Sequence, residues 1–166
     1  MSESKYTLSV RDFSVADKKA KPPTFNFPGL TLNIGPSDLT GDTIATVAVF
    51  NSTNEKTSNV VQVYYLPVDQ HPIDAVKPGL DTAVCGNCPL RPSNANVCYV
   101  RKFHGPSVVW RTFKAGRYPH YKDLSQADKN KVLSILKSKP IRLGAWGDPA
   151  PVISKLQSPL PVWHHR

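Results

Sequence analysis

Residues 60–68 have the sequence VVQVYYLPV, the strongest β-strand signal in the chain. β-branched and aromatic side chains favour strands because they pack well on a pleated, half-buried surface. Two earlier stretches carry related signals. DTIATVAVFN (42–51) is rich in β-branched residues, and GLTLNIG (29–35) alternates apolar and polar residues. We therefore predict a β-rich N-terminal segment over residues 1–58, followed by a strand over 60–68.

The rest of the chain predicts loops, two helices and a short strand. QHPIDAVKPGLDTAV (70–84) is expected to be loop, with room for one helical turn. GPSVVWRTFKAGRYP (105–119) predicts a short helix that stops at Gly116, a residue type typical of helix ends. LSQADKNKVLSILKSKP (124–140) begins like a capping box and predicts a longer helix, and IRLGAW (141–146) predicts a strand.

The order of these elements indicates an α+β fold. A helix-containing crossover joins the strands at 60–68 and 141–146, so we expect them to lie parallel in one sheet. The fold class is then a β-rich N-terminal part followed by a small β-α-α-β part that holds a metal site. The expected division is a β-rich segment over 1–58, a three-cysteine basic domain over 59–152 and an irregular tail over 153–166.

All three cysteines, Cys85, Cys88 and Cys98, lie within CGNCPLRPSNANVC (85–98). A Cys-x-x-Cys turn can place two sulfurs on one metal ion, and a third thiolate nearby makes a three-thiolate site. With His104 as the fourth ligand the pattern predicts zinc. Without a fourth protein ligand it predicts an iron–sulfur cluster with one open iron. The alternative is three unrelated thiols buried in a core.

The charge of the chain is unevenly distributed. Residues 1–83 carry seven Lys or Arg and nine Asp or Glu, a net charge of −2, whereas residues 84–166 carry fourteen and three, a net charge of +11. A segment with this much positive charge attracts polyanions, and nucleic acid is the commonest such partner. The alternative is a solvated surface that only keeps the protein soluble. The candidate contacts are Arg91, Arg101, Lys102, Arg111, Lys114 and Arg117, with Trp110 and Tyr118 as stacking groups.

Three blocks of the sequence carry a resemblance to a known family: AVCGNCPLRP followed by CYV (83–100), the 105–119 segment, and IRLGAWGDPAPV (141–152). In this order they resemble a family of uncharacterised bacteriophage proteins. The succession of strand, cysteine loop, helix, strand and Gly-Asp-Pro loop is also similar to the first part of a radical-SAM barrel. That likeness implies a truncated β/α barrel with Cys85, Cys88 and Cys98 as cluster ligands. It also implies that Gly147, Asp148 and Pro149 hold S-adenosylmethionine.

Three functional hypotheses follow. The preferred one is a phage-type protein with a three-cysteine metal site and a basic surface that contacts nucleic acid. The others are a truncated radical-SAM-like enzyme, and a virion or structural component whose metal staples a small fold and whose partner is another phage protein. We expect no membrane partner, because no apolar run approaches the roughly 20 residues that cross a bilayer. The sequence starts without a secretory signal pattern, and its odd number of cysteines does not suit a disulfide framework. We therefore expect a cytoplasmic location, which is the host cytoplasm if the protein is viral.

Overall fold

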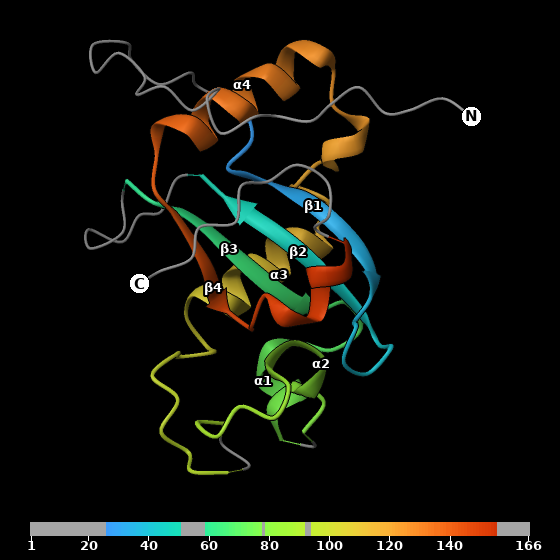
Figure 1. The fold of residues 1–166 in the computed structure, drawn as a ribbon, viewed down its shortest axis with the longest axis vertical. Coiled ribbons are helices and arrows are strands. Elements are labelled where there is room, and N and C mark those ends of the chain that lie inside the picture. The colour runs from blue at the N-terminus through green and yellow to red at the C-terminus, as the bar shows by residue number, and fades with distance from the viewer. Residues whose placement is uncertain (1–25, 51–58, 78, 92–93, 156–166) are drawn as a thin grey trace.

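The computed structural model describes residues 26–50, 59–77, 79–91 and 94–155 (Figure 1). Residues 1–25 and 51–58 of the predicted N-terminal segment lie outside the described residues, as do residues 156–166 of the predicted tail. Within the described part, no helix combines the length and the apolar character needed to span a bilayer.

Four strands form one mixed sheet in the order β1-β2-β3-β4 (Figure 1). They are β1 (Gly29–Pro36), β2 (Thr43–Val49), β3 (Val61–Pro67) and β4 (Ile141–Trp146). β2 pairs with both β1 and β3 in antiparallel orientation, and β3 pairs with β4 in parallel orientation. The predicted α+β class and the parallel alignment of β3 with β4 are therefore confirmed.

The sheet is open, so the expectation of a truncated β/α barrel is wrong. A β/α barrel is built from parallel strands joined by helices. Here β3 has antiparallel β2 on one side, and β1 and β4 are the edges. The connection from β1 to β2 is short, and a short connection can only join antiparallel strands. One sheet consequently contains strands from both sides of the predicted boundary between residues 58 and 59.

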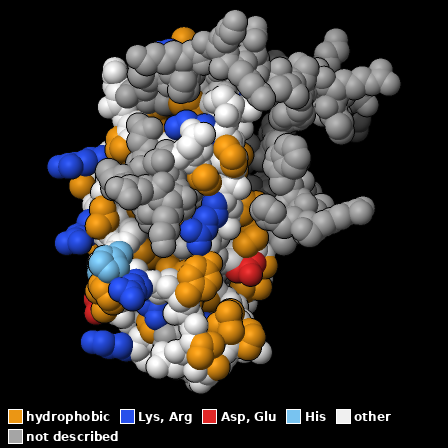
Figure 2. All heavy atoms as spheres, turned by 90° about the vertical axis from the view of Figure 1, so that its left-hand side faces the viewer, with side chains coloured by type: hydrophobic (Ala, Val, Ile, Leu, Met, Phe, Trp, Pro, Cys, Tyr) orange, Lys and Arg blue, Asp and Glu red, His pale blue; other side chains and the backbone are white. Residues whose placement is uncertain are grey.

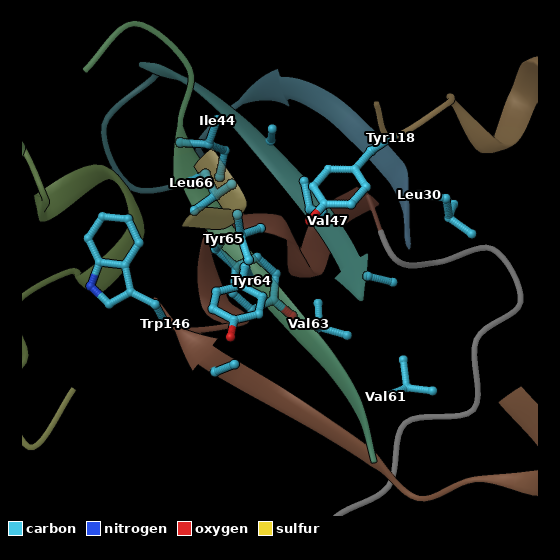
Figure 3. Close-up of a cluster of buried hydrophobic side chains, with 14 of the residues drawn as sticks. Leu30, Ile44, Val47, Val61, Val63, Tyr64, Tyr65, Leu66, Tyr118 and Trp146 are labelled. Atoms are coloured by element: carbon cyan, nitrogen blue, oxygen red, sulfur yellow. The ribbon is translucent and has the colours of Figure 1, made fainter. Parts of the chain in front are cut away.

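β3 lies in the middle of the hydrophobic core, and all seven of its residues are buried. Successive side chains of a strand point to opposite faces of the sheet, and Figure 3 shows neighbouring Tyr64 and Tyr65 among the buried side chains. A Cβ on Gly105 would lie 2.9 Å from the Tyr64 hydroxyl, and a Cβ on Gly147 would lie 2.8 Å from the Tyr65 Cβ. The chain thus approaches one face of β3 at residue 105 and the opposite face at residue 147.

In the described part of the chain, the helices that accompany the sheet are α1 (Pro72–Val76), α2 (Thr82–Cys85), α3 (Gly105–Lys114) and α4 (Gln126–Ser138). Short 3₁₀ helices follow at η3 (Tyr121–Asp123) and η4 (Ala150–Lys155). In the view of Figure 1, α3 lies behind the sheet and η4 in front of it.

The two predicted helices are confirmed, together with their end signals. The Ser125 hydroxyl accepts a hydrogen bond of 3.1 Å from the Asp128 amide at the start of α4. Gly116 follows α3 with a φ of +69°, which stops the helix. Residues 70–85 are more helical than expected, because they contain both α1 and α2. His71 caps α1, and its Nδ1 accepts from the Ile73 amide.

Several hydrogen bonds fix the helices to the sheet. The Trp110 indole Nε1 of α3 donates to the Pro67 carbonyl oxygen at the end of β3, at 2.9 Å. The hydroxyl of Thr31 in β1 donates to the Tyr118 carbonyl oxygen at 3.1 Å. The Ser37 hydroxyl donates to the Ala83 carbonyl oxygen of α2 at 2.7 Å. α2 and α3 therefore have fixed positions relative to the strands.

Candidate functional site

The loops that leave β3 and β4 emerge at the same edge of the sheet, because the two strands are parallel. The chain turns at Gly147, whose φ of +80° favours glycine. The Asp148 amide then donates a hydrogen bond of 2.6 Å to the carbonyl oxygen of Val84 in α2. Since Cys85 ends α2, the predicted proximity of the Gly-Asp-Pro loop to the start of the cysteine segment is confirmed for their backbones.

The carboxylate of Asp148 is exposed and takes part in this turn. Its Oδ1 accepts a hydrogen bond of 2.8 Å from the Ala150 amide at the start of η4. Burial raises the pKa of Tyr65 to about 12, and the Asp148 carboxylate contributes to the increase. Asp148 therefore has a structural use in the turn, and ligand binding by Gly147, Asp148 and Pro149 stays a prediction.

The thiol of Cys85 is in a setting that keeps it protonated. Burial, and then the Asp81 carboxylate, raise the pKa of Cys85 to about 12, against a lowering by the Arg91 guanidinium. Cys98 and Cys88 add smaller increases. Because the thiolate is the form that attacks electrophiles and binds metals, this environment disfavours the reactive form of Cys85 at neutral pH.

The predicted metal ligands do not form a coordination group. Within the described residues, no three Cys, His, Asp or Glu side chains are placed to hold one metal ion. Cys88 follows Cys85 by one turn, its amide donating to the Cys85 carbonyl oxygen at 3.2 Å. His104 precedes α3, and its ring lies 4.6 Å from the ring of Phe103. The residues as arranged thus do not form a site for a single metal ion, and metal binding stays a prediction.

Arg91 was expected to contact nucleic acid, but its side chain is buried. The guanidinium forms an ion pair with Asp81 and donates to the Thr82 hydroxyl at 2.9 Å. It also donates to the carbonyl oxygens of Gly86 at 2.8 Å and Gly79 at 3.0 Å. Its donors therefore organise residues 79–86, and the described structure gives no support to a phosphate contact by Arg91, which stays a prediction.

The two predicted stacking residues also have internal positions. Tyr118 is only 6% exposed and belongs to the core, so the described structure gives no support to base stacking on its ring, which stays a prediction. Trp110 is half-buried against the core, and its indole N–H is bonded to β3. The edge-to-face contact with His71, at 5.0 Å between ring centroids, further restricts Trp110. The interpretation of Trp110 as a packing residue is the better supported one.

The five other predicted basic residues reach solvent and form what we call the basic surface. The basic surface comprises Arg101, Lys102, Arg111, Lys114 and Arg117. Lys102 is half-buried, and the other four residues are exposed. Within the described residues, none of the five is in an ion pair with a carboxylate. Arg111 and Lys114 lie in the last turn of α3, where the helix dipole favours cations.

The sequence around the basic surface contains no acidic residue. Between Asp81 and Asp123 there are seven Lys or Arg and no Asp or Glu. Such a stretch has no carboxylate of its own to compensate its positive charge. Figure 2 shows Lys and Arg side chains interspersed with hydrophobic ones on the face that carries β4 and residues 94–104.

Two aromatic residues missing from the predicted stacking groups stand out on this side of the molecule. Tyr99 is 71% exposed and Phe103 is 61% exposed, and both lie in the segment 97–103 that leads to α3. They are two of the exposed large hydrophobic side chains of the described residues, and Tyr99 is the most exposed of these. Their signal in the sequence is the pattern YVRKF, in which two aromatic residues enclose Arg101 and Lys102.

Comparisons with models of protein families, with curated proteins and with solved structures gave no match for this chain. The argument about function therefore rests on the residues and geometry described above.

Proposed function

We propose that the protein binds nucleic acid through the basic surface. One observation carries the proposal: the five solvent-accessible cations of this surface belong to a stretch of sequence without any carboxylate. A solvated surface that only confers solubility usually mixes both signs of charge. A surface of one sign attracts a polymer of the opposite sign and raises its rate of association.

The basic surface offers the kind of contact that phosphates require. Arg and Lys donate several hydrogen bonds to phosphate oxygens, and each neutralised phosphate releases a condensed counterion. Such contacts fix the position of the nucleic acid but do not read its sequence. We accordingly expect binding with weak sequence preference and strong salt dependence.

Equilibrium binding of the full chain to a labelled oligonucleotide, measured over a series of salt concentrations, tests the proposal. If all five cations contact phosphates, the logarithm of the association constant should fall with the logarithm of salt at a slope of about −3.5 to −4.5. Arg111→Ala and Arg117→Ala should each make the slope shallower by about one. No binding at low salt would reject the proposal.

Lys131→Ala is the matched control, because it removes an exposed cation from α4, outside the basic surface. Lys131 is already paired with Asp128 at 3.1 Å. The proposal requires that this variant keep the slope of the wild type. An equal change of slope in Lys131→Ala and Arg111→Ala would mean that net charge alone, and not the basic surface, attracts the oligonucleotide.

The metal-binding hypothesis is independent of this proposal. Elemental analysis and visible absorbance of protein purified without oxygen test it, because an iron–sulfur cluster is coloured and zinc is not. Membership of the phage family, radical-SAM-like chemistry and a role in the virion likewise stay predictions from the sequence.

A further inference from the structure

We infer that the nucleic acid bound by the basic surface is single-stranded, and that Tyr99 and Phe103 are the residues on which its bases stack. This inference rests on the proposed function and specifies its ligand. The inference is based on two highly exposed aromatic residues, Tyr99 and Phe103, which flank Arg101 in the sequence. Arg101 is itself exposed and belongs to the basic surface.

Both ends of the segment that carries the two rings are attached to the fold. At one end, the amides of Asn94 and Asn96 donate to the Arg91 carbonyl oxygen at 2.9 Å and 3.0 Å. At the other end, the Lys102 carbonyl oxygen accepts from both the amide and the hydroxyl of Ser107, which is buried in α3. The rings are therefore presented from a held position, which lowers the entropy lost on binding.

The contacts of the two aromatic side chains leave large parts of both rings exposed. The hydroxyl of Tyr99 accepts a hydrogen bond of 3.1 Å from Arg142 of β4, which fixes the tip of the side chain. Phe103 contacts the ring of His104 at an interplanar angle of 45°, yet stays 61% exposed. Each side chain can thus receive the flat face of a base.

Stacking on these rings requires bases whose faces are free. In a duplex the faces of the bases are covered by their neighbours, and only the edges reach the grooves. Unpaired bases stack on aromatic side chains, while a cationic groove follows the backbone between them. The alternation of aromatic and cationic residues in Tyr99, Arg101 and Phe103 matches this mode of binding, and the charge of the basic surface matches the phosphates.

The test is the affinity of the full chain for fluorescent strands of about 20 nucleotides, longer than the roughly 4–16 that one such site covers. Single-stranded DNA, single-stranded RNA and the duplex of the same sequence are the three probes. We expect both single strands to bind more tightly than the duplex. Tyr99→Ala and Phe103→Ala should each weaken single-strand binding about 5- to 100-fold.

Two matched variants complete the design. Val97→Ala removes an equally exposed apolar side chain, 61% exposed, from the same segment. It should bind like the wild type, because it has no ring. Tyr99→Phe keeps the ring and loses only the hydrogen bond with Arg142, so it should stay close to the wild type. All four substitutions are at exposed positions, and circular dichroism verifies that the fold is retained.

The outcomes separate the inference from the proposed function. Binding of the duplex as tightly as the single strands overturns the inference and leaves the proposed function intact. Normal single-strand binding by Tyr99→Ala and Phe103→Ala also overturns it. Absence of binding to all three probes at low salt rejects both.

Discussion

Arg91 shows how a single charged side chain can shape the segment that contains Cys85. Its guanidinium bonds to the side chains of Asp81 and Thr82 and to the backbone of Gly79 and Gly86. Because the donors of Arg91 replace water around these groups, the loss of either charge would leave the other buried and unpaired. Removing one partner of such a pair is costlier than removing both.

We expect Arg91→Ala and Asp81→Ala each to lower the free energy of unfolding by about 3–5 kcal/mol. The double variant should lose less than the sum of the two, because no unpaired charge remains. Urea denaturation of the three variants measures these differences. Arg101→Ala, an exposed position, is the control and should change stability by less than about 0.5 kcal/mol. A loss in Arg91→Ala no larger than in this control would show that the ion pair does not stabilise the fold.

The raised pKa of Cys85 predicts that the folded protein loses stability in alkaline solution. Its pKa is raised from 9.0 to about 12 in the folded protein, so the folded state holds the thiol proton more tightly than the unfolded state. The resulting stabilisation is fully present below pH 9 and is lost as the pH rises towards 12. The slope is at most about 1.4 kcal/mol per pH unit for one group.

Comparing Cys85→Ala with the wild type isolates this effect from the titration of the tyrosines. Urea midpoints measured below pH 9 and between pH 9 and 12 should fall further for the wild type than for the variant. An identical pH dependence would contradict the raised pKa.

At the scale of elements, the turn after β4 depends on how closely its backbone approaches β3. A Cβ at position 147 would lie 2.8 Å from the Tyr65 Cβ and 3.1 Å from the carbonyl oxygens of Tyr65 and Val84. Gly41 supplies a matched comparison. Its φ of +81° is nearly that of Gly147, but no atom lies within 4 Å of the Cβ that it would carry.

Gly41→Ala should therefore reveal the conformational strain alone, about 1–2 kcal/mol. Gly147→Ala should lose about 1–3 kcal/mol more, since the backbone of Tyr65 and Val84 cannot move aside. The measurement is the difference between the two free energies of unfolding in urea. Equal losses in the two variants would mean that β4, β3 and α2 are not in the close contact described here.

Local signals explain which elements could be predicted. The start of α4 at Ser125 and the end of α3 at Gly116 are specified by neighbouring residues, and both were predicted from the sequence. α2 was missed because it has only four residues, no side-chain cap, and a position stabilised by Ser37 from far along the chain. Contacts of that kind leave no periodic pattern in the sequence.

At the scale of the whole molecule, the described strands form one sheet that crosses the predicted boundary between residues 58 and 59. β3 is buried along its entire length, and β2 supplies its antiparallel neighbour. A fragment that begins at residue 59 would expose that edge of β3 together with its apolar side chains. We expect the fragment 59–166 to be unfolded or aggregated, in contrast to the full chain.

The dispersion of amide signals in NMR spectra of the fragment and the full chain measures this difference. A well-dispersed spectrum of the fragment would show that residues 59–152 fold independently, as the predicted domain division implies. A second fragment, 1–67, retains β1, β2 and β3 and serves as the comparison.

The topology of the site could be predicted further than its chemistry. Parallel β3 and β4 follow from the crossover rule, and this placed the Gly-Asp-Pro loop near α2. The burial of Arg91 could not be predicted, because it depends on Asp81 and on carbonyl groups that only the fold brings together. Tyr99 and Phe103 were missed for a related reason: an aromatic residue in a loop is equally compatible with burial and with exposure.

The parallel pairing of β3 with β4 also determines the order in which this protein can be completed during synthesis. Val61 pairs with Ile141, so β3 lacks one neighbour until the cysteine segment, the basic surface and α4 have all been translated. Domains fold as units while the chain emerges, and pairing of distant strands is slow. We therefore expect nascent chains to expose the edge of β3 while residues 68–146 are translated, and to depend on chaperones until β4 leaves the ribosome.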